Sequence, residues 1–242
     1  MLKLQKLSCQ LQEKLFYTVN TRWYSVVYGK LALAASLGLR TKIILSEIDE
    51  PDAFEIVSQV LNHKFDLQEI KSVLLEPLPL LVDKKDFNWE YPNLLNHEEL
   101  VRKIDCFLNA SNSSLSNIHQ VMSAKAILYL CAGIIGSTST DLKPIEIRII
   151  TGLTTGAGMG SSASFSVCVA AALVQYVKSQ RSVNSFSKHS FKPSHWNIDL
   201  DFFNAKELDL ICHWSFCAEK IIHGTPSDVI NPLVIQFFQN IY

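Results

Sequence analysis

The sequence has no run of basic residues and almost no net charge. Its 22 Lys and Arg are balanced by 23 Asp and Glu, which leaves a formal net charge of −1. A protein that binds the phosphate backbone of nucleic acid normally carries a basic face, so we expect no nucleic-acid partner. The six cysteines are scattered and form no Cys-x-x-Cys pair. This usage indicates free thiols in a reducing compartment rather than disulfides or a zinc site.

Long apolar runs are also missing. The two most apolar stretches, residues 126–135 and 163–177, are shorter than the roughly 20 residues that a membrane-spanning helix needs. The chain starts MLKLQKLSCQLQEKLF, which lacks the continuous apolar segment of a secretory signal. The sequence therefore predicts a soluble, cytoplasmic protein with no membrane partner.

The sequence does contain enough apolar material for a substantial core. Hydrophobic residues make up 48% of the 242 positions and charged residues 19%. This balance excludes disorder as the main state, and the length allows one large domain or two small ones.

The residue pattern mixes strands and helices. Residues 30–48 suggest two strands joined around Gly38, and Glu50-Pro51-Asp52 then breaks the run. Residues 180–197 are polar and Ser-rich with one proline, which predicts a long loop. Helices are predicted over residues 97–108, 120–135, 162–178 and 204–222. This order is typical of a two-layer α+β domain.

The clearest strand pattern lies at residues 145–150. Ile145, Ile147 and Ile149 fall on one side, and Glu146 and Arg148 fall on the other. Such alternation indicates a strand with one buried and one solvated face.

A glycine-rich segment follows this strand and precedes a predicted helix. Three glycines within five residues let the backbone turn tightly and approach a ligand closely. The next helix presents unpaired N–H groups and a positive dipole end, and Ser161 or Ser162 can cap it. We expect a phosphate site here, although a flexible turn with a serine cap is an alternative. The segment reads Gly156-Ala157-Gly158-Met159-Gly160-Ser161-Ser162.

Two common phosphate loops do not fit this segment. A Walker A loop needs a lysine, and none occurs between Arg148 and Lys178. A Rossmann loop needs an acidic residue about 20 positions further on, where the chain has Tyr176, Lys178 and Arg181. The HRD and DFG sequences of protein kinases are absent as well.

The same segment resembles the second motif of the GHMP kinases, usually Pro-Pro-Gly-Ala-Gly-Leu-Gly-Ser-Ser-Ala. That resemblance implies that residues 156–162 wrap the phosphates of ATP and that Ser162 binds Mg²⁺. The chain departs from the motif in having Thr154 and Thr155 in place of the two prolines, and Gly152 where a glutamate is common.

A second stretch, residues 214–227, resembles the mevalonate kinases within that superfamily, in which a Gly-Glu-Arg/Lys helix runs into His-Gly-Asn/Thr-Pro-Ser-Gly-Val/Ile-Asp-Asn. The match implies that Glu219 is the second Mg²⁺ ligand. Without the resemblance, Glu219 would be interpreted as a solvated glutamate near a helix end. The residues implied to lie near the substrate are His223, Gly224, Thr225, Pro226 and Ser227.

The general base of that family does not align with an acid. Its aspartate position holds Ile230, which cannot accept a proton. Asp228 lies two residues earlier and would replace the base only if the loop shifts. An ordinary turn aspartate is the alternative interpretation of Asp228.

The resemblance is lost at both ends. The first motif would place its catalytic lysine on Tyr17 and its Glu-His pair on Trp23 and Tyr24. We expect a divergent segment over residues 1–25, the GHMP kinase N-terminal domain over 26–231 and a divergent tail over 232–242. The family's C-terminal GHMP domain is absent, which suggests a truncated or alternatively spliced product or a faulty gene model.

The resemblance implies a two-layer domain like the second domain of ribosomal protein S5. It implies transfer of the γ-phosphoryl group of ATP to the 5-hydroxyl of mevalonate, with ATP and Mg²⁺ as cofactors, in isoprenoid and sterol biosynthesis. It also allows a homodimer. A catalytically inactive relative that binds nucleotide or a partner is the alternative function, and another GHMP small-molecule kinase is a third.

Overall fold

The computed structural model describes the central part of the chain and three short stretches near its start. Of residues 6–9, 16–18, 34–36 and 181–186 only the backbone is described. The remaining described residues are 39–75, 92, 95–110, 115, 117–138, 140–154, 160–180 and 203–223.

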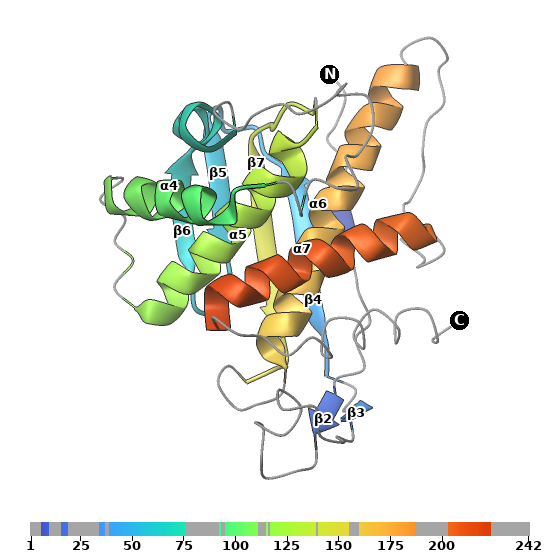
Figure 1. Ribbon diagram of the computed structural model, residues 1–242. Helices are drawn as coiled ribbons and strands as arrows, with labels where there is room; N and C mark the ends of the chain where they lie inside the picture. The colour runs from blue at the N-terminus through green and yellow to red at the C-terminus, as the bar shows by residue number, and fades with distance from the viewer. Residues whose placement is uncertain are drawn as a thin grey trace.

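A five-stranded sheet forms one side of the domain (Figure 1). All neighbouring strands are antiparallel except β5 and β7, which are parallel. The strands, in their order across the sheet, are β1 (Lys6–Cys9), β4 (Thr41–Glu47), β7 (Ile145–Thr151), β5 (Ala53–Val57) and β6 (Asn62–Asp66).

A separate two-stranded sheet pairs β2 (Phe16–Thr18) with β3 (Ala34–Ser36). The two strands predicted within residues 30–48 therefore exist as β3 and β4, but they belong to different sheets.

The central strand β7 has the predicted alternation. Ile145, Ile147 and Ile149 are buried, whereas Arg148 is exposed. Arg148 forms two hydrogen bonds with Glu146 on the same outer face, 2.7 and 3.0 Å long. One face of the sheet is therefore apolar and needs a cover.

Helices supply that cover (Figure 1). The helix α6 packs on β4, α5 packs beside α6, and α7 packs against both helices. The α+β architecture predicted from the sequence is confirmed. The helical segments are α2 (Leu67–Ile70), the π-helical η1 (Lys71–Leu75), α4 (His97–Ala110), α5 (Ile118–Gly136), α6 (Ser161–Phe186) and α7 (Ala205–His223).

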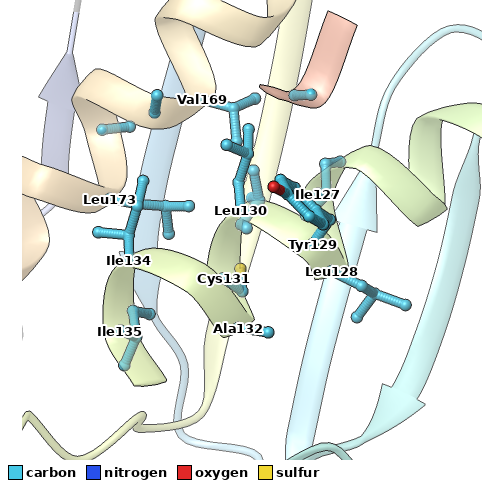
Figure 2. Close-up of a cluster of buried hydrophobic side chains, with 14 of the residues drawn as sticks. Ile127, Leu128, Tyr129, Leu130, Cys131, Ala132, Ile134, Ile135, Val169 and Leu173 are labelled. Carbon is cyan, nitrogen blue, oxygen red and sulfur yellow. The ribbon is translucent and has the colours of Figure 1, made fainter. Parts of the chain in front are cut away.

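The helix α5 is the core helix of the domain. By length and composition it is apolar enough to cross a membrane, yet most of that stretch is buried inside the fold. Figure 2 shows its side chains meeting Val169 and Leu173 of α6. A helix that is apolar all round is expected in such a position. It begins two residues before the predicted start because Asn117 and Gln120 form a reciprocal capping box.

The helix α6 is longer than predicted. The predicted loop at 180–197 is wrong for residues 180–186, where the helix continues to Phe186. Ser179 does not break the helix because its hydroxyl donates to the carbonyl of Tyr176 within it. Gln180 anchors this part of α6 by donating to Glu47 Oε1 on β4, 2.7 Å away. Such tertiary contacts override the weak helix propensity of a Ser-rich segment.

The helix α7 contacts α6 at both of its ends. At its start, Asn204 and Glu207 form a reciprocal pair of side-chain-to-backbone hydrogen bonds, 2.8 and 3.0 Å long. Lys178 of α6 donates to the same Glu207 carboxylate at 2.9 Å. The other end of α7 meets the start of α6, so the two helices run in opposite chain directions.

The helices α5 and α7 approach closely at Gly133. A Cβ atom added there would lie 2.3 Å from two ring carbons of Trp214, which is 1% exposed. The Trp214 ring also packs edge-on against Tyr129, with ring centres 6.0 Å apart. The distance between the two helices therefore depends on a glycine at position 133.

We expect Gly133→Ala to destabilise the fold by about 1–3 kcal/mol, because the indole must move within a packed core. Chemical denaturation followed by circular dichroism measures the loss. Gly152→Ala is the matched control, since a Cβ there meets only ordinary contacts, the nearest at 3.6 Å. A Gly133→Ala protein as stable as the unsubstituted one would show that the helices are not in close contact.

Candidate functional site

Four polar side chains meet where the start of α6 faces the end of α7. Ser162 and Ser166 lie one turn apart on α6, and Glu219 and His223 lie one turn apart on α7. Residues four apart occupy the same helix face, so each helix directs two groups toward the other.

Glu219 is the centre of this cluster. Ser162 Oγ donates to its Oε2 and Ser166 Oγ donates to its Oε1, each at 3.0 Å. His223 Nε2 lies 2.8 Å from Ser162 Oγ and 3.8 Å from Glu219 Oε2. Because the single hydroxyl proton of Ser162 is donated to Glu219, the contact with His223 requires an Nε2–H donor. The result is a chain of hydrogen bonds from His223 through Ser162 to Glu219.

The Glu219 carboxylate is buried, with 6% of its side chain exposed. The interpretation of Glu219 as a solvated glutamate is therefore wrong, because the α6–α7 contact covers it. Burial raises the pKa of its carboxyl above the ordinary value, and His223 and the hydrogen bonds from Ser166 and Ser162 oppose part of that rise. Among the residues that the structure describes, no lysine or arginine forms an ion pair with Glu219. The buried acid therefore lacks a strong cationic partner within this region.

Gly160 is the residue before the first turn of α6. Its φ is +69°, a conformation that costs other residues about 1–2 kcal/mol. Its carbonyl accepts the first helical hydrogen bond, from Ser164 N at 3.0 Å. Ser161 and Ser162 lie inside the helix rather than at its cap, which differs from the expected cap. The Ser162 hydroxyl instead donates a hydrogen bond to Glu219 on α7.

Several predicted site residues lie outside the described residues, and their roles stay predictions. They are Gly156, Ala157, Gly158 and Met159 of the loop, and Gly224, Thr225, Pro226, Ser227 and Asp228 after α7.

Ser166 was missed by the sequence analysis. Its signal was its spacing of four residues from Ser162, which puts both hydroxyls on one face of α6. The serine lies in an otherwise apolar helix, and the sequence offered no indication that a buried acid would face it.

Ser162 and Glu219 fit a Mg²⁺ ion. Mg²⁺ prefers oxygen ligands at 2.0–2.1 Å in octahedral geometry, so neighbouring ligands lie about 2.9 Å apart. Ser162 Oγ and Glu219 Oε2 are 3.0 Å apart. Within the described part of the chain no three His, Cys, Asp or Glu residues gather to hold a metal. A cation here would take its other ligands from phosphates and water, as Mg²⁺ commonly does.

Comparison with known proteins gives a consistent match. The family described as "GHMP kinases N terminal domain" matches residues 122–189, which include all of β7 and α6 and most of α5. The chain is 36% identical over 221 residues to the mevalonate kinase of Bos taurus and 28% identical over 220 residues to that of Homo sapiens. It is 29% identical over 211 residues to the mevalonate kinase of Candida albicans. Each match covers 86% of this chain but only 44–47% of the relative, so the chain spans about half the length of these relatives.

We expect Glu219→Gln to raise the melting temperature of the metal-free protein at pH 8, with a smaller difference near pH 5. The folded state favours the neutral acid. Its stabilising contribution is complete below the ordinary pKa of 4.5 and is lost as the pH rises through the raised value. Glutamine stays neutral throughout and does not suffer this loss.

Thermal melts between pH 5 and pH 8 in the presence of a chelator measure this difference. Glu98→Gln, at an exposed position of α4, is the control for the loss of one carboxyl group. A difference that grows toward acid pH would contradict a raised pKa of Glu219.

Proposed function

We propose that the chain is a mevalonate kinase-type phosphotransferase, since the family model of the GHMP kinase N-terminal domain matches residues 122–189. The proposed reaction moves the γ-phosphoryl group of ATP to the 5-hydroxyl of mevalonate, an early cytoplasmic step of isoprenoid and sterol biosynthesis. The observation that carries the proposal is the Ser162–Glu219 pair at the start of α6. Its two oxygens have the chemistry and the spacing that suit the Mg²⁺ of a nucleotide.

The start of α6 is the proposed site for the phosphates. The first turn of a helix presents N–H groups without helical partners and a positive dipole end, both of which favour anions. We assign the ATP phosphates to residues 156–162 and Mg²⁺ to Ser162 and Glu219. A bound Mg²⁺ would neutralise negative charge on the phosphates while the γ-phosphoryl group is transferred. The segment from His223 to Ser227 lies next along the chain and is assigned to mevalonate.

The proposed general base is Asp228. It stands two residues before Ile230, which occupies the position of the family's aspartate and cannot accept a proton. In this proposal the carboxylate of Asp228 takes the proton of the 5-hydroxyl group. Replacement of Asp228 by Ala should then remove turnover without weakening Mg²⁺·ATP binding, because the role proposed for this carboxylate is on the alcohol and not on the nucleotide.

A specific observation also favours a second function. Ile230 stands at the position of the family's general base, and Tyr17 stands at the position of its catalytic lysine. Neither side chain can replace the residue that the family has there. These changes favour a catalytically inactive relative that retains the α6–α7 site and binds Mg²⁺·ATP or a partner without turnover.

The test is Mg²⁺-dependent phosphorylation of mevalonate by the purified protein, with its fold checked by circular dichroism. We expect turnover that falls about a hundredfold or more in Glu219→Ala, since a metal ligand is removed. Glu98→Ala, at an exposed site, is the control and should retain full activity.

Equilibrium binding of Mg²⁺·ATP separates the two functions. Binding without turnover supports the inactive relative. A folded protein that neither binds Mg²⁺·ATP nor phosphorylates mevalonate contradicts both.

A further inference from the structure

We propose that Ser166 is the positioning residue of the α6–α7 site: it holds Oε1 of Glu219 so that Oε2 faces Ser162 and the cation. This inference rests on the proposed function of the site and extends it to a residue that does not contact the cation itself.

The geometry gives each serine one oxygen of the same carboxylate. Ser166 Oγ donates to Oε1 and Ser162 Oγ donates to Oε2, both at 3.0 Å. The terminal torsion of a glutamate is broad and has no strong preferred angle of its own. A donor on one oxygen therefore fixes the plane of the carboxylate and the direction of the other oxygen.

Ser166 differs in its hydrogen bond from Ser179 and Ser215, two other serines of these helices. Ser179 on α6 and Ser215 on α7 donate to carbonyls of their own helices, at 2.7 and 2.8 Å. Ser166 instead donates across the helix interface to Glu219. It is fully buried, at 0% exposure, where a hydroxyl without a hydrogen-bond partner is unfavourable. The buried Ser166 hydroxyl therefore needs Glu219 as its acceptor, and Glu219 Oε1 needs that hydroxyl as its donor.

Ser162 and Ser166 also differ in how many groups they contact. Ser162 Oγ lies within hydrogen-bonding distance of both Glu219 and His223, and in the proposed site it is a metal ligand as well. Ser166 Oγ has a hydrogen bond to Glu219 alone among the described residues. When the Ser162 hydroxyl reorients toward a cation, the Ser166 bond still holds the carboxylate in place. Outer ligands of this kind commonly orient the groups that bind a metal.

The test measures cation affinity directly. Mn²⁺ is titrated into the protein with saturating ADP, and free Mn²⁺ is followed by electron paramagnetic resonance. We expect Ser166→Ala to weaken Mn²⁺ binding about tenfold or more, as is typical of groups that orient metal ligands. Ser215→Ala is the matched control, because Ser215 is also 0% exposed but donates only to the carbonyl of Cys212. It should stay within about twofold of the unsubstituted protein.

Three outcomes would contradict the inference. An unchanged Mn²⁺ affinity of Ser166→Ala, in a protein that melts normally, would remove the role of Ser166 and leave the proposed function intact. An equal loss in Ser166→Ala and Ser215→Ala would identify a general packing effect. No Mn²⁺ binding by the unsubstituted protein would overturn the proposed function and this inference together.

Discussion

The burial of one carboxylate between α6 and α7 is the constraint on which the site depends. Glu219 reaches the start of α6 only because α7 lies across α5 and α6 at a fixed distance and direction. Gly133 permits that distance, and the Lys178–Glu207 ion pair fixes the far end of the helix pair. The sheet contributes indirectly, because it holds α6 through β4 and through the Gln180–Glu47 hydrogen bond. Elements far apart in sequence thus determine a separation of 3.0 Å between two oxygens.

The same burial disfavours the ionised form of Glu219 when no cation is bound. Among the residues that the structure describes, no lysine or arginine pairs with this carboxylate, so burial favours its neutral form, and the hydrogen bonds from Ser162 and Ser166 offset only part of this cost. A divalent cation would supply the missing charge. The energetic cost of burying the carboxylate and the affinity for a cation therefore have the same physical origin, which is a common arrangement in functional sites.

Much of the fold could be predicted from the sequence, because its signals are periodic. The alternation of Ile145, Ile147 and Ile149 gave β7, and the apolar run after Asn117 gave α5. The end of α6 could not be predicted, since its extension depends on the Gln180–Glu47 contact between distant residues. The pairing of Ser162 with Glu219 was expected only from resemblance. The role of Ser166 required the structure, because spacing gives the face of a helix but not the group opposite it.

The contact between the two helices at both ends has a further consequence for folding. The site joins a residue at position 162 to one at 219, so it does not exist until α7 has docked on α6. Long-range contacts of this kind form late relative to local ones because the intervening chain must first lose entropy. By mass action, a ligand that needs both helices stabilises the docked state by an amount that grows with ligand concentration. Slower exchange of the α7 amide hydrogens would then report occupancy of a site that those amides do not themselves contact.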